Sequence, residues 1–455
     1  MFRTRSIDKP AEPVASPRAP RKVKNVIEVV LRGFSFVYLI AIIVGIVVYK
    51  ALFIKLLIGD PFFAVYGLSV AGYILSRFIL SLFYRSGKHH GIEPRVAIVM
   101  PGFNEEEAIA QSLRSLLELE YPADKLELVA VNDGSTDRTL VEMRKVERDA
   151  NGRVHVISFP ENRGKRAAMA AGIRATDAEI IAFVDSDSML EPDALRVLVQ
   201  HFAKPKVGAV AGHAEVLNIK ESWMSRMQAV RYFVAFKVLK AAESVFSSVT
   251  CCSGCFAAYR REAIMPHLEA WEHQRFLGKP ATFGDDRSLT NFVLRDWKVP
   301  YEAKAVSHTI VPATLKKFLT QQVRWKRSWT RESLIAARFI WRKNPIVALS
   351  VYIGIILPLA APIAAGRAML WRPLVDHAGS PLLYLIGIYA MATIYGLYYA
   401  MRQNRWDALW VFGILFVFFY LCFLVWQTYY AILTSNRTSW GTRPSEHIQV
   451  AEEPA

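Results

Sequence analysis

The chain has 455 residues, of which 53% are hydrophobic, and it carries a formal net charge of +16. This length exceeds that of one ordinary domain, and the positive mean hydropathy of +0.21 argues against an entirely soluble protein. The excess of Lys and Arg lies beside apolar stretches, where basic clusters contact anionic head groups. We therefore expect membrane lipids, and no nucleic acid, among the partners.

Five apolar stretches are candidate membrane spans, and the last three are long enough to cross a bilayer outright. They cover residues 33–49, 61–76, 344–366, 377–401 and 408–436. The first two predict a transmembrane hairpin within 26–90, and the last three predict a C-terminal transmembrane region over 343–436. A basic tail over 1–25, predicted to be disordered, precedes them. By the positive-inside rule, the basic flanks place the tail and the segment between the two groups of spans in the cytoplasm.

The last stretch, 408–436, is too long for one straight crossing. Its 29 residues would form about 43 Å of helix, whereas the hydrocarbon layer is about 30 Å thick. We predict that it bends within the bilayer and returns to the cytoplasmic side. Residues 437–455 would then form a cytosolic gating loop and tail.

The segment 91–314 alternates predicted strands with predicted helices, which indicates an α/β fold with a mainly parallel sheet. The strands are expected over 96–100, 126–131, 154–159 and 180–184. Ligands of such sheets bind at the carboxyl ends of the strands. The polar residues that follow these strands should therefore meet at one edge: Asp133, Lys165, Asp185 and Asp187.

Asp185 and Asp187 directly follow a buried strand and are separated by one residue. Two carboxylates at this spacing can share one Mg²⁺ or Mn²⁺, with phosphate oxygens completing its shell. An acidic turn after a strand would explain the pair without a ligand, but the convergence of Asp133 and Lys165 favours a binding site. Lys165 follows a glycine at a predicted helix start, a position suited to a diphosphate.

Two segments mix aromatic and basic residues, 222–246 and 315–342. This composition is typical of helices that lie at a membrane interface. A surface helix packed on the sheet would explain the first segment nearly as well.

Five short motifs occur in the order found in family 2 glycosyltransferases, and the whole chain resembles their processive, membrane-embedded synthases. The motifs are Asp133-Gly134-Ser135, Asp185-Ser186-Asp187, Gly284-Asp285-Asp286, Gln321-Gln322-Val323-Arg324-Trp325 and Trp440-Gly441-Thr442-Arg443. The segments 283–291 and 321–332 look most like hyaluronan synthases, and nodulation-type chitooligosaccharide synthases are similar. The resemblance implies a GT-A-like nucleotide-sugar-binding domain between transmembrane segments.

The resemblance also implies roles for single residues. Asp286 would be the general base, and Asp187, together with Asp185, would bind the metal. Trp440 would belong to a gating loop. The donor would be bound by Asn104, Glu105, Asp133, Lys165, Asp185, Arg324, Thr442 and Arg443. The acceptor would be bound by Ser253, Gly254, Cys255, Gln321 and Trp325.

The function implied is an inverting β-glycosyltransferase that polymerises sugars from UDP-sugars and passes the growing polysaccharide through its own membrane spans. UDP-GlcNAc is the first candidate donor and UDP-GlcA the second. The expected location is the plasma (inner) membrane, with the catalytic domain in the cytoplasm. Hyaluronan synthases usually have proline where this chain has Cys255, which leaves the sugar open.

Three alternatives are a chitin-type N-acetylglucosaminyltransferase, a non-processive lipid-linked transferase, and a transporter or scaffold that only binds nucleotide. A transporter would be expected to carry charges at mid-membrane, which the spans of this chain nearly lack.

Overall fold

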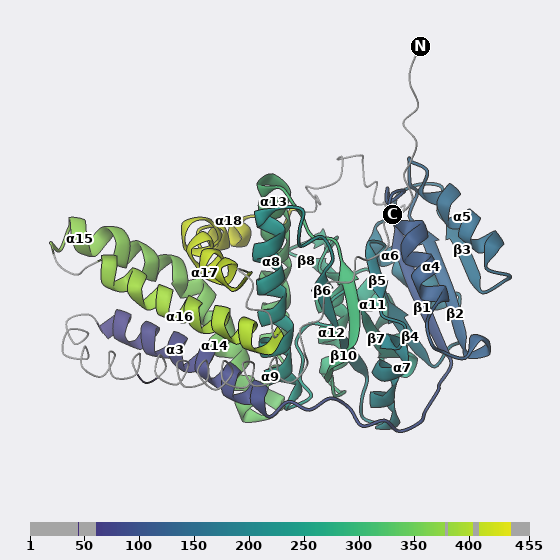
Figure 1. The fold of residues 1–455 in the computed structure, drawn as a ribbon, viewed down its shortest axis with the longest axis horizontal. Coiled ribbons are helices and arrows are strands. Elements are labelled where there is room, and N and C mark those ends of the chain that lie inside the picture. The colour runs from purple at the N-terminus through teal and green to yellow at the C-terminus, as the bar shows by residue number, and fades with distance from the viewer. Residues whose placement is uncertain (1–43, 45–60, 378–380, 404–408, 438–455) are drawn as a thin grey trace, which may run out of the picture.

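The computed structural model describes residues 44, 61–377, 381–403 and 409–437. Figure 1 shows a bundle of long helices on one side and an α/β part on the other, with helices α8 (Trp223–Phe233) and α13 (Leu315–Ala337) between them. The N-terminal tail and almost all of the first candidate span lie outside the described residues. So do Trp440, Thr442 and Arg443.

The α/β part contains an eight-stranded sheet in the order β3-β2-β1-β4-β7-β6-β10-β5. Its strands are β1 (Val96–Gly102), β2 (Leu126–Asn132), β3 (Val154–Ser158), β4 (Ile180–Phe183), β5 (Ser188–Leu190), β6 (Ala209–Val216), β7 (Ala257–Arg260) and β10 (Tyr301–Thr309). The pairs β1–β2, β2–β3, β1–β4 and β6–β10 are parallel, which confirms the predicted mainly parallel sheet. Strand β7 is antiparallel to β4 and β6, and β5 is antiparallel to β10.

Helices cover both faces of the sheet because its central strands are apolar on both sides. In β1, Ala97 and Val99 pack into one core, whereas Val96 and Ile98 pack into the other. The longer elements around the sheet are α4 (Ile109–Leu117), α5 (Thr139–Asp149), α6 (Lys165–Arg174), α7 (Ala194–Val199), α11 (Leu268–Glu272) and α12 (Asp285–Leu294). The shorter ones are η1 (Ala123–Lys125), η2 (Gln200–Ala203), α10 (Arg261–Ile264), η4 (Met265–His267), β8 (Arg275–Phe276) and β9 (Lys279–Pro280).

Three helical stretches of the described chain are long and apolar enough to cross a membrane: Val65–Leu82, Pro345–Leu374 and Tyr384–Met401. They belong to α3 (Pro61–Leu82), to the run α14 (Pro345–Gly366), η6 (Arg367–Trp371) and α15 (Arg372–Leu374), and to α16 (Pro381–Gln403).

A fourth candidate span is bent. It consists of α17 (Leu409–Phe419) and η7 (Tyr420–Leu424), followed by α18 (Gln427–Leu433), and the two halves meet at an angle of 47°. The segment is therefore bent, as predicted, and its return to the cytoplasmic side stays a prediction. Its second half packs on α13, where the Arg327 Nε donates to the Thr434 hydroxyl at 3.0 Å.

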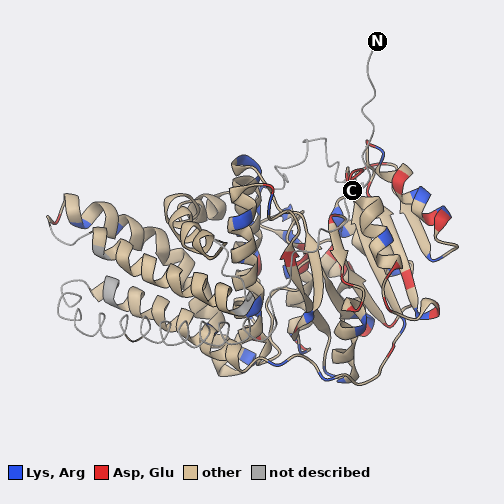
Figure 2. Cartoon of the chain, in the orientation of Figure 1, with Lys and Arg blue, Asp and Glu red and all other residues tan. Residues whose placement is uncertain are grey.

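Helix α8 continues through the π-helix η3 (Val234–Lys240) into α9 (Ala241–Ser244), and α13 is followed by η5 (Ile340–Arg342). Helix α8 packs on β6 of the sheet and also on α17 of the bundle. The segment 222–246 thus packs on the sheet, which was one of the two predicted surroundings, and also on the helical bundle. Figure 2 shows the bundle helices almost free of charge, whereas Lys and Arg are prominent on α8 and α13.

Candidate active site

The loop after β1 is held against the loop after β2. Asn104 has a positive φ of 55°, and its Oδ1 accepts a hydrogen bond from the backbone N of Thr136 at 2.9 Å. The backbone N of Glu105 donates to the Thr139 hydroxyl at 2.7 Å. These bonds hold the two predicted donor residues beside the loop that follows Asp133.

Asp133 is buried at the end of β2 and fixes the start of α6. Its Oδ1 accepts hydrogen bonds from the backbone N of Arg163 at 2.8 Å and of Gly164 at 3.2 Å. Lys165 is the next residue along the chain. The carboxylate that was predicted to bind nucleotide therefore also determines where the Lys165 side chain begins.

Lys165 joins Asp185 across the carboxyl edge, since its Nζ donates to Asp185 Oδ1 at 2.5 Å. Burial lowers the pKa of Lys165, but the charges of Asp185 and then Asp285 raise it above its usual value, so Lys165 stays protonated. The predicted convergence of these loops is thus present in the structure.

Asp187 lies on the short connection between β4 and β5. Its Oδ1 accepts hydrogen bonds from the hydroxyls of Ser188 at 3.2 Å and Thr309 at 3.4 Å. Burial and then the charge of Asp185 raise the pKa of Asp187 to about 6. Because one lysine faces two neighbouring carboxylates, the site has negative charge left to balance. Carboxylate oxygens are the ligands that Mg²⁺ and Mn²⁺ prefer, so these residues fit a divalent cation.

The loop 251–255 bridges the Asp185 region and the predicted base. The backbone N of Asp185 donates to the Gly254 carbonyl at 3.0 Å. A Cβ on Gly254 would lie 2.8 Å from both carboxylate oxygens of Asp185, so any larger residue would displace that carboxylate. At the other end of the loop, the Cys251 thiol donates to Asp286 Oδ2 at 3.5 Å.

The three cysteines of this loop stay protonated. Burial and then the charge of Asp286 raise the pKa of the Cys251 thiol to about 12. Burial, followed by Asp185 and Asp187, also raises the pKa of Cys255. The cysteine that replaces the usual proline is therefore a neutral thiol beside the predicted metal ligands.

Lys240, the last residue of η3, supports the same loop. Its Nζ donates to the Cys251 carbonyl at 2.6 Å and to the Ser253 hydroxyl at 3.3 Å. The sequence placed Lys240 on an amphipathic helix and did not indicate this contact.

Asp285 anchors the helix that carries Asp286. It forms a buried ion pair with Arg166, with Arg166 Nε 2.6 Å from Asp285 Oδ1. Arg166 also donates to the Trp271 carbonyl at 2.9 Å, and the Trp271 indole donates to the Asp285 carbonyl at 3.2 Å. Arg166 thus positions the first turn of α12. Arg166 directly follows Lys165 in the sequence, but no sequence pattern predicts its pairing with Asp285, which lies far along the chain.

Helix α13 packs against α12. Arg331 donates to the Phe283 carbonyl and, at 2.7 Å, to Glu332, and Glu332 accepts from Asn291 at 3.0 Å. Gly284 has φ +76°, and a Cβ there would lie 2.4 Å from Ser328 Cβ. Because of these contacts, α12, which carries the predicted base Asp286, forms one packed unit with α13, which carries Gln321, Arg324 and Trp325.

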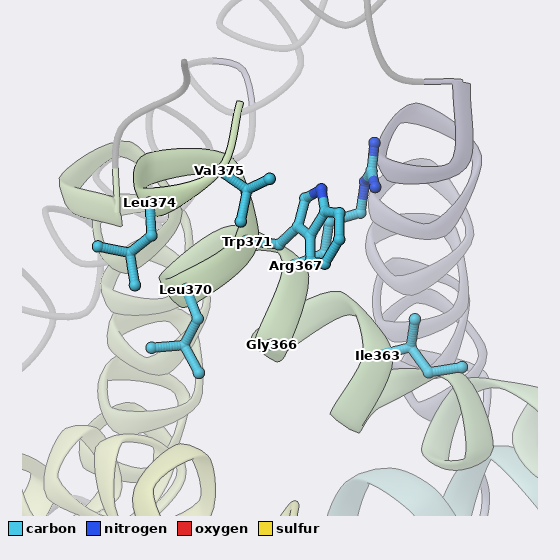
Figure 3. Close-up of a pocket in the computed structure, with 7 residues that line it drawn as sticks. All are labelled: Ile363, Gly366, Arg367, Leu370, Trp371, Leu374 and Val375. Carbon is cyan, nitrogen blue, oxygen red and sulfur yellow. The ribbon is translucent and has the colours of Figure 1, made fainter. Parts of the chain in front are cut away.

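Two other features of the described structure lie apart from this edge. Glu269, Glu272 and His273 could hold a metal ion, but Glu272 is already paired with Arg174 at 2.6 Å. A hollow of about 450 Å³ lies at the α15 end of the bundle and is lined mainly by apolar side chains, with Arg367 and Trp371 side by side (Figures 1 and 3). Neither contains a predicted catalytic residue.

Ligands of such sheets bind at the carboxyl ends of the strands, and an Asp-x-Asp pair, a lysine and a further aspartate there suit a nucleotide-sugar-dependent glycosyltransferase. Residues 97–268 match the model of glycosyl transferase family 2. The hyaluronan synthase of Streptococcus pyogenes is 32% identical over 416 residues, covering 90% of this chain and 96% of that protein. The chain therefore belongs to glycosyltransferase family 2, among the processive synthases of hyaluronan-synthase type, as predicted.

Two further likenesses are more limited. An N-acetylglucosaminyltransferase of Rhizobium meliloti is 35% identical over 282 residues, which cover 61% of this chain and 66% of that protein. The solved mannosyltransferase of Pyrobaculum calidifontis, in complex with GDP-Man and Mn²⁺, has a TM-score of 0.56 at 22% identity. The match covers 79% of this chain and 99% of the mannosyltransferase chain. This likeness confirms the predicted GT-A fold.

Proposed function

We propose that this chain extends a β-linked polysaccharide from UDP-sugars and passes the product through its membrane helices. The observation that carries the proposal is the continuous set of contacts from Lys165 through Asp185 and the loop 251–255 to Asp286. A donor diphosphate and an acceptor hydroxyl need these groups within one site: a cation, metal-binding carboxylates and a base.

In this proposal Asp286 accepts the proton of the acceptor hydroxyl as that oxygen attacks the donor sugar from the side opposite the diphosphate. Cys251 and the buried pair Arg166–Asp285 hold the base in place. Lys165 neutralises charge on the leaving diphosphate. A divalent metal, Mg²⁺ or Mn²⁺, held by Asp187 and Asp185, would neutralise more of it when bound.

The donor is assigned to the loops at the carboxyl edge and the acceptor to α13 and the loop 251–255. The donor residues are Asn104, Glu105, Asp133, Lys165, Asp185 and Arg324, with Thr442 and Arg443 from the C-terminal segment. The acceptor residues are Ser253, Gly254, Cys255, Gln321 and Trp325. Trp440 is assigned to gating, as in the family pattern.

The proposed donors are UDP-GlcNAc and, for a hyaluronan-type product, UDP-GlcA as well. The streptococcal relative, a hyaluronan synthase by name, supports the pair of donors because it aligns over nearly the whole chain. The rhizobial N-acetylglucosaminyltransferase supports a second candidate, a chitin-type synthase that uses UDP-GlcNAc alone. The proposed location is the plasma (inner) membrane with the catalytic part in the cytoplasm, where UDP-sugars are made.

The test is to incubate the purified chain with single and paired UDP-sugars and to measure UDP release and product size. Release only with UDP-GlcNAc and UDP-GlcA together, with long products, is expected for a hyaluronan-type synthase. Turnover with UDP-GlcNAc alone would support the chitin-type candidate. Release from neither sugar nor from the pair, or products extended by only one sugar, would contradict a processive synthase.

A further inference from the structure

Arg77 is a buried charge in a membrane helix. It is the one charged residue in the candidate span Val65–Leu82 of α3, and it is only 5% exposed. An arginine that contacted lipid head groups would extend to the surface of the bundle. Arg77 instead lies within the protein, where α3 packs on α9 and η3 beside the catalytic part (Figure 1). Its Nε donates to the Ser76 hydroxyl at 3.4 Å, and its guanidinium lies over the Tyr73 ring.

Glu243 on α9 is the acidic residue that shares a hollow with Arg77. The hollow has a volume of about 10 Å³, and Ser248 and Ser350 also line it. Among the described residues that line it, Glu243 carries the only negative charge. A hollow of this size has room for no more than about one water molecule. Because little solvent separates the two charges, their attraction is only weakly screened.

The carboxylate of Glu243 also holds the residue that begins the catalytic loop. Its Oε2 accepts a hydrogen bond from the backbone N of Thr250 at 3.0 Å, and its Oε1 accepts one from the Thr250 hydroxyl at 3.0 Å. Hydrogen bonds to an ionised acceptor are stronger than those between neutral groups. Thr250 directly precedes Cys251, whose thiol donates to Asp286 Oδ2 at 3.5 Å. The contacts therefore lead from Glu243 to the predicted base.

Two residues of one helical run hold this loop at successive positions. Glu243 binds Thr250, and Lys240, three residues earlier, donates to the Cys251 carbonyl at 2.6 Å. The rest of the loop 251–255 carries the residues assigned to the acceptor. A displacement of the loop by about 1 Å would misalign the acceptor hydroxyl with the base, and misplacement of this size can cost about 10²-fold in rate.

We propose that Glu243 is a positioning residue of the transfer reaction. It holds the loop 251–255 against Asp286, and Arg77 on the membrane helix α3 balances the charge of its carboxylate. The inference rests on the synthase function proposed above and adds a connection from a membrane span to the acceptor side of the active site. A pair that only stabilised the fold would leave the position of the loop unchanged in every variant that folds.

The test compares the purified full-length wild type with E243Q, T250V, R77Q and R77K in nanodiscs of phosphatidylcholine and phosphatidylglycerol. E262Q and R85Q are the matched controls, because Glu262 and Arg85 are exposed. Steady-state UDP release gives kcat and the KM of the donor, and calorimetry gives the affinity for UDP. Thermal unfolding shows whether each variant is folded.

Alkylation of the loop cysteines reports the position of the loop directly. The folded chain is treated briefly with iodoacetamide and then digested with trypsin. Cleavage after Lys240 and Arg260 releases the peptide 241–260, which contains three cysteines and separates them from Cys422. In the wild type, burial and then the charge of Asp286 raise the pKa of Cys251 to about 12, so its alkylation should be slow. A displaced loop should expose its thiols and react faster.

E243Q should lower kcat by about ten-fold or more, while the donor KM and the affinity for UDP change by less than about two-fold. It should also speed alkylation of the peptide 241–260. T250V removes only the hydroxyl bond and should show a smaller change of the same kind. R77Q should lower kcat less than E243Q does, and R77K should restore most of the loss because it keeps the charge. The double variant R77Q/E243Q should be no slower than E243Q, and both controls should match the wild type.

An unchanged kcat in E243Q would overturn the inference. So would an equal loss of donor affinity, or a lower kcat with alkylation as slow as in the wild type. If E243Q does not fold, wild-type kcat and alkylation rates in both T250V and R77Q would overturn it. Additive losses in R77Q and E243Q would overturn the part assigned to Arg77. Absence of UDP release by the wild type from every donor mixture would instead contradict the synthase function.

Discussion

Fully or partly buried cations lie both at the catalytic edge and at the seam, which is the contact of α8 and α13 with α17, η7 and α18. Among the described residues, only those at the edge are paired with carboxylates. Lys165 is bonded to Asp185 and Arg166 to Asp285. Arg231 and Lys326 have aromatic rings, a carbonyl and a hydroxyl as their partners. The buried pair of Arg166 and Asp285 holds the protein's own geometry, whereas the pair of Lys165 and Asp185 lies within the proposed donor site. The difference separates cations that carboxylates balance from cations that only aromatic rings and neutral oxygens surround.

The largest expected effect concerns the base at the edge. D286N should lower UDP release by about 10³-fold while leaving UDP-sugar binding nearly unchanged, because the base acts on the acceptor and not on the donor. Steady-state UDP release and calorimetric binding of the donor measure the two quantities. D296N, which changes an exposed acid just beyond the same helix, should behave as the wild type. An equal loss of donor affinity in D286N would show that Asp286 is a binding residue.

The second-largest expected effect concerns the predicted metal site. D187N, or addition of EDTA to the wild type, should reduce UDP release by about 10²-fold or more, because charge on the leaving diphosphate is no longer neutralised. Mn²⁺ added in excess should restore the EDTA-treated wild type but not D187N. Full activity in EDTA would contradict a metal-dependent mechanism.

Removing one partner of a buried ion pair should lower the free energy of unfolding. R166M leaves Asp285 buried without its partner, which should destabilise the fold by about 3–5 kcal/mol. Chemical or thermal unfolding of the purified chain measures this change. The double variant R166M/D285N should recover part of the loss. R196Q breaks an exposed pair with Glu120 and should change stability little. A similar loss in both single variants would remove the distinction between buried and exposed pairs.

The smallest effect is a pH dependence at the seam. The pKa of Lys326 is about 8 in the folded chain and 10.5 for an ordinary lysine. Between these values the unfolded chain binds more protons than the folded one, so this residue makes stability rise with pH. K326M should lack that contribution, seen as a flatter Tm profile from pH 8 to 10.5. K316M, which changes an exposed lysine on the same helix, should keep the wild-type profile. Identical slopes in K326M and the wild type would contradict the lowered pKa.

The features of the fold and of the site that the sequence predicts are those determined by residues close together in the chain. Strand ends place Asp133, Lys165 and Asp185 at one edge, because parallel strands terminate together. The excess length of the segment 408–436 predicted that it bends, and the structure places the bend between Leu424 and Gln427. The partnership of Arg166 with Asp285 could not be predicted in the same way, since it joins elements far apart in the chain. Arg231 appeared in the sequence as one of several basic residues on an amphipathic segment, and only the packing shows that no carboxylate of the described residues pairs with it.

Strands β4 and β5 are four places apart in the sheet but nearly adjacent in the chain. Five residue steps from Phe183 to Ser188 reach at most about 18 Å, whereas four strand spacings in a flat sheet are about 19 Å. The connection also contains a turn, in which the Ser188 backbone N donates to the Asp185 carbonyl at 3.0 Å, so it spans less than its extended length and the sheet curls. Asp185 and Asp187 lie on this turn. Ser188 pairs with Thr309, whose hydroxyl contacts Asp187. A ligand bound by both carboxylates would therefore lie on the turn that joins the central strand β4 to the edge strand β5, and one residue inserted before Ser188 would lengthen that turn.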